Sequence, residues 1–173
     1  NCLELSCQEI IDRCTSAGLK YIDPHFKQEL KIFRYADKMW FPLCLKRPDM
    51  IWEDKEVKLF DSISPGDINQ GNLGDCWLLG MIGALAEYPE TTKSFFDIKK
   101  SSPAIGMYAV RLFDMGRPVW YYLDDLLPLT RGSEGKLAFL HSKQAELWPS
   151  LLEKASARKY GAYAYLDAAN HTI

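Results

Sequence analysis

Hydrophobic side chains recur at helical spacing in three stretches of the chain. In the first, CQEIIDRCTSAG, an apolar residue returns every three or four positions. Ser6 and Glu9 have the spacing of a capping box at its start. The pattern predicts a helix over about 7–17, and we expect Cys7 and Cys14 to pack on its apolar face.

The second stretch, CWLLGMIGALAEYP, is apolar on nearly every face and stops before Pro89. It predicts a buried helix over about 76–87. Gly80 and Gly83 each lower its intrinsic helix propensity by about 1 kcal/mol, and they leave room for close approach by a neighbouring backbone.

The second half of the chain also predicts a β-hairpin and a third helix. MYAVRLFD and PVWYYLDD alternate in polarity around the turn DMGR, which predicts paired strands at about 107–113 and 118–124. KLAFLHS at 136–142 offers a third short strand. In AELWPSLLEKASARKYG, Pro149 is tolerated only in a first turn, so the helix is expected to start near 146–148.

Residues 20–66 show no sustained periodicity and carry several prolines. We expect them to wrap the core as an irregular segment, with short helical turns near 26–30 and 47–50. A long stretch of this kind inside a compact domain often has a functional role.

Composition narrows the class of protein. The chain has 173 residues, of which 47% are hydrophobic and 25% charged, as in an ordinary globular domain. A net charge of -2 gives no electrostatic reason to expect nucleic acid or an anionic membrane as a partner. No apolar run reaches the ~18 residues of a transmembrane helix, and the first residues do not resemble a signal peptide.

The cysteines favour a reducing environment. There are five, with no CxxC pair, and the three histidines are scattered, so neither a disulfide framework nor a zinc site is expected. Reduced thiols in the cytoplasm are the better interpretation.

Cys76 stands between a glycine-rich run and the apolar helix, in NQGNLGDCWLLG. A nucleophilic cysteine needs a stabilised thiolate, an oxyanion stabiliser and a base. The first turn of a helix offers unpaired N–H groups and a dipole that favour a thiolate. Gly71 and Gly74 let the backbone bend ahead of it. The side-chain amide of Gln70 and the Cys76 N–H can then converge as an oxyanion hole.

Other interpretations of Cys76 are a metal ligand or an inert buried residue. The arrangement Gln-x5-Cys-Trp is that of papain-like proteases. Their usual local signature has small residues and a second cysteine before the nucleophile, whereas this chain has Leu73, Gly74 and Asp75 there.

QGNLGDCWLL closely resembles the active-site string of calpains, the calcium-regulated intracellular cysteine proteases. SAGLKYIDPHF, LKRPDMI, YYLDDLLPL and KLAFLHSKQAELWPSLLEKASARKYGAY resemble further calpain segments and occur in the same order. The resemblance covers about residues 7–166.

The resemblance implies an α+β fold: the left lobe of a papain-like protease, mainly helical with a small antiparallel sheet. Residues 1–173 would form one domain, the N-terminal half of a calpain-type catalytic core, with an extension over about 1–20. Its parent would be a cytoplasmic endopeptidase acting on protein substrates. Cys76 would be the nucleophile, and Gln70 with the Cys76 N–H would form the oxyanion hole.

In such proteases the histidine base and its orienting asparagine come from a second subdomain. In papain-like enzymes they lie roughly 130–150 residues after the cysteine. Since 97 residues follow Cys76 in a chain of 173, His141 and His171 come too early, and His141 is expected to be structural. The chain alone is therefore expected to be inactive.

The resemblance also implies a calcium site. The matching side chains are Asp67 and Glu146, and backbone carbonyls would come from about Phe60 and Ser62. Calcium takes six to eight oxygens, which two carboxylates, carbonyls and waters can supply. Two departures alter the loop: Ser62 stands at a glycine position, and Pro65 stands where an arginine that links the subdomains is frequent.

Two further questions stay open at this level. Asp124 and Asp125 are adjacent carboxylates at a strand end, where successive side chains point to opposite faces, so we expect structural or turn-capping roles rather than a shared ion. The parent could also be a calpain-like calcium-binding scaffold that no longer cleaves, or a thiol transferase of related fold. A histidine and an asparagine at about 200–270 of the parent would separate these alternatives.

Overall fold

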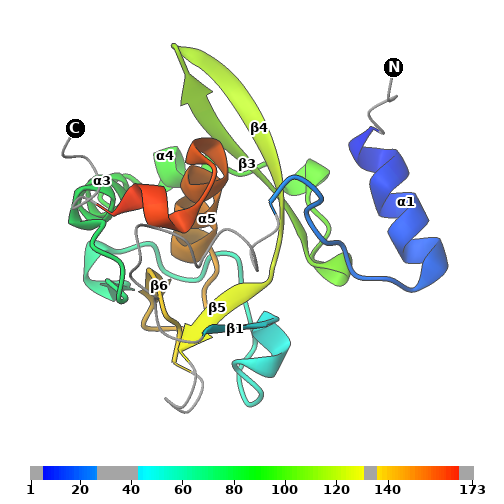
Figure 1. Ribbon diagram of the computed structural model, residues 1–173, viewed down its shortest axis with the longest axis horizontal. Helices are drawn as coiled ribbons and strands as arrows, with labels where there is room; N and C mark the ends of the chain where they lie inside the picture. The colour runs from blue at the N-terminus through cyan, green and yellow to red at the C-terminus, as the bar shows by residue number, and fades with distance from the viewer. Residues whose placement is uncertain (1–5, 27–42, 131–135, 168–173) are drawn as a thin grey trace.

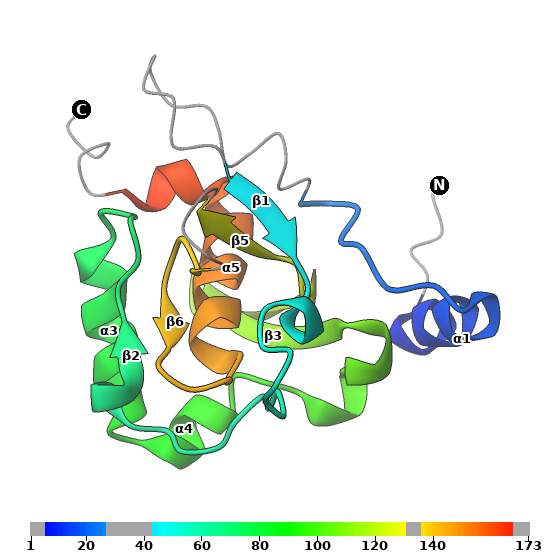
Figure 2. The ribbon, with the colours of Figure 1, turned by 90° about the horizontal axis from the view of Figure 1, so that it is seen from below.

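Helix α5 (Trp148–Tyr160) runs through the middle of the molecule (Figures 1 and 2). The computed structural model describes residues 6–26, 43–130 and 136–167. Helix α3 (Cys76–Ala86) lies on one side of α5, and helix α1 (Cys7–Ala17) lies at the opposite end of the molecule. The described strands form antiparallel pairs around α5 rather than one continuous sheet.

The remaining elements are short. The strands are β1 (Leu43–Lys46), β2 (Ile68–Asn69), β3 (Met107–Asp114), β4 (Arg117–Asp124), β5 (Leu127–Thr130) and β6 (His141–Ser142), and the other helical segments are α4 (Pro89–Lys93), η1 (Pro48–Met50), η2 (Pro65–Asp67), η3 (Ile98–Lys100), η4 (Pro103–Ile105) and η5 (Tyr163–Leu166). The strands pair as β1 with β5, β2 with β6 and β3 with β4. This mixture of helices and small antiparallel sheets agrees with the predicted α+β class.

The core is built on α5, since every residue from Trp148 to Ala157 is buried. Trp148 and Leu151 are fully enclosed and pack with Leu123 of β4 and Ile82 of α3. Complete burial of a large apolar side chain contributes about 1.5–3 kcal/mol. The apolar residues of α5 thus hold the hairpin and α3 on the same core.

A buried ion pair joins α5 to the end of β4. The Lys154 ammonium and the Asp124 carboxylate are both enclosed, with Nζ 2.5 Å from Oδ1. Lys154 also donates to the carbonyl oxygens of Asp124 at 2.7 Å and Leu126 at 2.8 Å. Burial lowers the pKa of Lys154, and the negative charge of Asp124 acts in the opposite direction. The ammonium is stable there because three acceptors surround it.

The adjacent aspartates have separate structural roles, as predicted. Asp124 faces Lys154 and also accepts the Asp23 backbone N–H at 2.8 Å. Asp125 forms an ion pair with Arg47, which also donates to the Tyr21 carbonyl at 3.0 Å. The two carboxylates therefore tie different segments to the strand end and do not converge on one site.

The predicted first helix and hairpin are confirmed. Helix α1 has the capping box between Ser6 and Glu9. The Cys7 thiol donates to the Lys100 carbonyl at 3.1 Å, and Cys14 packs beside it against a small cluster around Met107. Strands β3 and β4 each extend the predicted hairpin by one residue towards the turn.

The prediction for the second helix is wrong about burial. In α3 the buried residues are Leu78, Ile82 and Ala86, while Met81 is 57% exposed. A methyl group added at Gly80 or Gly83 would meet no atom within 4 Å, so no neighbouring backbone approaches these glycines. The apolar residues on the outer face made the whole helix look buried. An apolar helix sequence does not by itself determine which faces pack against other elements.

The segment between 43 and 66 contains more secondary structure than expected, whereas the predicted strand over 136–142 is mostly irregular. The first of these contains β1, and η1 fits the turn predicted near 47–50, whereas the turn predicted near 26–30 lies mostly outside the described residues. Within 136–142 only β6 is a strand, and it pairs with β2 instead of the hairpin. None of the helices in the described ranges has the length and apolarity needed to cross a membrane.

Replacing Asp124 by alanine should destabilise the chain by about 3–5 kcal/mol, because the buried Lys154 ammonium loses its counter-charge. Urea denaturation followed by circular dichroism measures the change. Glu90→Ala is the control: Glu90 pairs with Lys93 on the surface and is 87% exposed, so its loss should cost less than about 1 kcal/mol. Equal effects of the two substitutions would contradict the assigned role of the buried pair.

Candidate active site

Cys76 is the first residue of α3 and is exposed. The first helical hydrogen bonds run from the N–H groups of Leu78 and Leu79 to the Asp75 carbonyl, at 2.8 and 3.1 Å. The N–H groups of Cys76 and Trp77 precede these bonds and have no acceptor within the helix. The thiol therefore lies where backbone N–H groups can face a negatively charged atom.

Glycine is required where the loop before Cys76 crosses the chain that leads to β6. A Cβ on Gly71 would lie 2.3 Å from both the Ala138 carbonyl oxygen and the Phe139 Cα. The next residue, Asn72, donates its backbone N–H to that same carbonyl at 2.6 Å. This contact fixes the path of the loop between β2 and α3.

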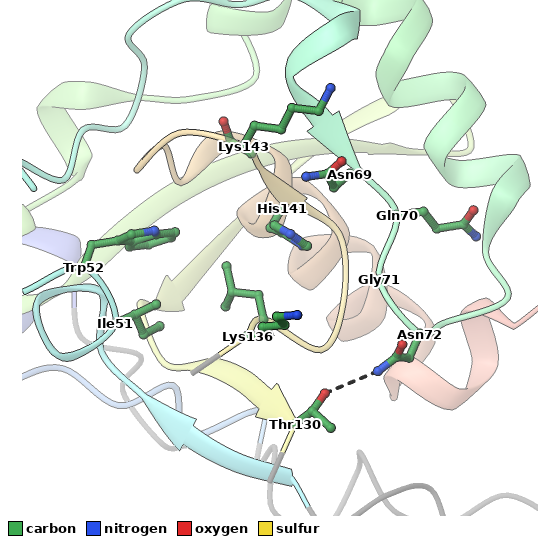
Figure 3. Close-up of a pocket in the computed structure, with 12 residues that line it drawn as sticks. Ile51, Trp52, Asn69, Gln70, Gly71, Asn72, Thr130, Lys136, His141 and Lys143 are labelled. Carbon is green, nitrogen blue, oxygen red and sulfur yellow. Dashed lines mark hydrogen bonds between the residues drawn. The ribbon is translucent and has the colours of Figure 1, made fainter. Parts of the chain in front are cut away.

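Gln70 follows β2 directly, and its side-chain Nε2 donates to the Leu73 carbonyl at 3.0 Å. Figure 3 shows the Gln70 side chain directed away from His141 and towards the chain that leads to α3. A side-chain amide has two N–H groups, and this bond uses one of them. The Gln70 side chain also interacts with the buried Asp75 carboxylate.

The start of α3 also packs against the segment after α5. The Trp77 indole Nε1 donates to the Leu166 carbonyl at 2.8 Å. A Cβ on Gly74 would lie 2.8 Å from an Asp167 carboxylate oxygen, so the acid lies directly over this glycine. The residues on both sides of Cys76 are therefore held by contacts that are distant in sequence.

Two acids beneath this loop were missed as a pair by sequence reasoning. Asp75 is 0% exposed and Glu153 of α5 is 1% exposed. Burial raises the pKa of Asp75, and interactions with Glu153 and Gln70 partly offset this effect. Burial and the charge of Asp75 raise the pKa of Glu153 well above its usual value. The only signal in the sequence is a glutamate placed among the apolar residues of the third helix.

A cavity of about 580 Å³ lies beside Gln70. Figure 3 shows Trp52, Lys136 and His141 around it, contributed by segments far apart in sequence. His141 Nδ1 lies 2.7 Å from the Phe139 carbonyl oxygen, and the structural role of this histidine stays a prediction. The other predicted non-catalytic histidine, His171, lies outside the described residues.

The candidate calcium ligands come from two segments, the loop before β2 and the chain between β6 and α5, which meet where Asp61 donates to Glu146. Ser62 Oγ lies 3.2 Å from an Asp67 carboxylate oxygen. Glu146 is buried and accepts the Asp61 N–H at 2.6 Å and the Ser142 hydroxyl at 2.9 Å. The Phe60 carbonyl belongs to the same peptide group as the Asp61 N–H that donates to Glu146.

The chemistry of this donor set fits calcium, since carboxylate and carbonyl oxygens are its preferred ligands. Both Glu146 oxygens have a protein donor, but each carboxylate oxygen can accept more than one interaction. Within the described part of the chain, no three acidic, histidine or cysteine side chains gather as a metal-binding group. A calcium ion would therefore depend on backbone carbonyls and water for most of its ligands.

Replacing Gly71 by alanine should cost about 1–3 kcal/mol of stability, because its Cβ would collide with backbone atoms that cannot rotate away. The matched control is Gly80→Ala in α3, where the added methyl meets no atom within 4 Å. That change should stabilise the chain by about 0.5–1 kcal/mol. Thermal unfolding of both variants measures these changes in stability. A Gly71→Ala variant as stable as wild type would contradict the close approach of Gly71 to the backbone at 138–139.

The sequence matches the calpain family of cysteine proteases over residues 21–172. Calpain-13 of Rattus norvegicus is 31% identical over 161 residues, which cover 90% of this chain and 24% of that protein. Calpain of Schistosoma mansoni is 36% identical over 170 residues, covering 95% of this chain and 22% of that protein. The calpain-1 catalytic subunit of Homo sapiens is 31% identical over 163 residues, with 90% and 22% covered.

The chain thus spans about a quarter or less of the length of these relatives. The match extends from the segment before β1 to the end of the described structure and includes the loop that carries Gln70 and Cys76. This protein belongs to the calpain family of cysteine proteases.

Proposed function

We propose that the chain is the nucleophile-bearing N-terminal subdomain of a calpain-type endopeptidase, with the architecture of a papain-like left lobe. The observation that carries this proposal is the exposed Cys76 at the first turn of α3. Its position puts the thiol beside backbone N–H groups, and the loop before it presents Gln70. Protein substrates would bind across this surface.

In the proposed reaction, the Cys76 thiolate attacks the carbonyl carbon of a peptide bond. The Gln70 amide and the Cys76 N–H stabilise the negative charge that develops on the carbonyl oxygen. A histidine from a second subdomain, oriented by an asparagine, receives the thiol proton and passes it to the leaving amine. Water then hydrolyses the thioester and regenerates Cys76.

Calcium would bind to the Asp67 and Glu146 carboxylates and to the carbonyls of about Phe60 and Ser62. Asp67 is the residue before β2, and Gln70 is the residue after it. An ion held at the first end of this strand can therefore affect how the second end presents the oxyanion donor. We place the protein in the cytoplasm, which agrees with the unpaired cysteines of the described residues.

The chain alone should hydrolyse peptides no faster than its Cys76→Ala variant, because general-base catalysis worth about 10²–10⁴-fold comes from the second subdomain. A longer protein that includes this subdomain should be active, and Gln70→Ala should lower its kcat by about 10²–10³-fold. A fluorogenic peptide assay measures both effects. Activity that survives Cys76→Ala would contradict the nucleophile, and a folded but inactive longer protein would favour the non-catalytic scaffold.

Calcium should raise the thermal midpoint of the chain, by an amount equivalent to about 2.7 kcal/mol at a concentration one hundred times the Kd. Asp67→Ala should abolish this shift, whereas Asp54→Ala, which removes an exposed acid outside the proposed ligand set, should retain it. Calorimetric titration of the three proteins checks the result. No heat and no thermal shift in wild type would contradict the calcium site.

A further inference from the structure

The side chains of Asp75 and Glu153 interact with one another at the start of α3. Both side chains are almost completely enclosed, with 0% and 1% of their surface exposed. Within the described part of the structure, neither carboxylate oxygen of Asp75 has a hydrogen-bond partner of good geometry. Its side-chain neighbours are the Gln70 amide and the Glu153 carboxyl, and the carboxyl can donate a hydrogen bond only when it carries a proton.

Two ionised carboxylates are unstable in this position. Each would be desolvated, and their like charges would repel one another at low effective dielectric. With one proton between them, the pair carries a single negative charge and gains a strong O–H···O⁻ hydrogen bond. The Leu140 N–H lies 3.2 Å from both Glu153 oxygens and supplies a backbone donor to the glutamate.

The surrounding groups favour a proton on the glutamate. Burial and the charge of Asp75 raise the pKa of Glu153 well above its usual value. Asp167 adds a further negative charge near Asp75 from the segment after α5. Tyr163 is fully buried on the same side, and the charges of Glu153, Asp124 and Asp75 add to the effect of burial in raising its pKa.

We propose that Asp75 and Glu153 share one proton, and that their hydrogen bond is a positioning device for Cys76 and Gln70. Asp75 is the residue before Cys76, and its carbonyl accepts the first helical hydrogen bonds of α3. Its side chain, bonded to α5, fixes the direction in which the first N–H groups of α3 point. The shared proton rests on the burial and the contact of the two acids, whereas the positioning role rests on the proposed function of Gln70 and Cys76.

Infrared difference spectroscopy tests the shared proton. At neutral pH the wild-type chain should show a carbonyl band of a protonated carboxyl group, and Glu153→Gln should lack it. Glu90→Gln is the control, because it removes an exposed glutamate and should leave the band unchanged. Identical spectra of wild type and Glu153→Gln in this region would overturn the shared proton. The wild-type spectrum is informative even if a variant folds poorly.

The pH dependence of stability provides a second test. Because the folded-state pKa of Glu153 is raised, its stabilising contribution is complete below the usual glutamate value and is lost as pH rises through the raised value. Glu153→Gln donates an amide N–H to Asp75 at every pH. The thermal midpoint of wild type relative to Glu153→Gln should therefore fall as pH rises above about 4.3. A difference that does not change with pH would contradict the inference.

Alkylation of Cys76 by iodoacetamide tests the positioning role separately. Glu153→Ala removes the hydrogen bond between Asp75 and α5 and should slow alkylation by about tenfold, which corresponds to roughly one lost hydrogen bond. Glu153→Gln should restore the rate to within about twofold. If the protonated carboxyl is present but Glu153→Ala reacts like wild type, the positioning role is wrong while the shared proton stands. Inactivity of the longer protein with both results intact would instead count against the proposed function.

Discussion

Helix α5 passes through the core while carrying a lysine, a glutamate and serines, and each of these polar groups must find a partner inside the protein. Lys154 is satisfied by the end of β4, through Asp124 and the nearby carbonyls. Ser150 donates to the Leu140 carbonyl at 2.8 Å, and Glu153 accepts the Leu140 N–H. An unpaired polar group would cost far more than the net gain from a satisfied one, so α5 fixes the elements that supply these partners.

The active-site loop depends on the same constraint. The chain around Leu140 is held by α5, and two residues earlier the Ala138 carbonyl accepts the Asn72 N–H and packs against Gly71. Glu153 also interacts with Asp75 at the end of the loop. The residues between β2 and α3 are thus held by the chain around Ala138 and by Glu153. Helix α5 holds the first of these through hydrogen bonds and carries the second. Under the proposed function this arrangement positions Gln70 and Cys76, although no side-chain hydrogen bond joins either residue to α5 within the described ranges.

Local patterns predicted the elements whose stability is largely local. The capping box defined the start of α1, alternation defined the hairpin, and Pro149 placed the start of α5. The exposed outer face of α3 could not be predicted, because the burial of a helix face depends on which other elements pack against it. The pairing of β2 with β6 and the meeting of Asp75 with Glu153 join residues far apart in sequence, and spacing gives no signal for such contacts. Gln70 and Cys76 were found because their spacing is local and their motif is specific.

Glu153 and Lys154 of α5 fix different parts of the structure, and hydrogen exchange measured by mass spectrometry tests this claim most directly. Glu153→Ala should speed exchange in peptides covering 69–79 and 138–142 and leave the hairpin at 107–124 unchanged. Asp124→Ala, which unpairs Lys154, should show the reverse pattern, with faster exchange around the end of β4 and β5. Faster hydrogen exchange throughout the chain in both variants, or faster exchange in the same peptides in both, would contradict the claim.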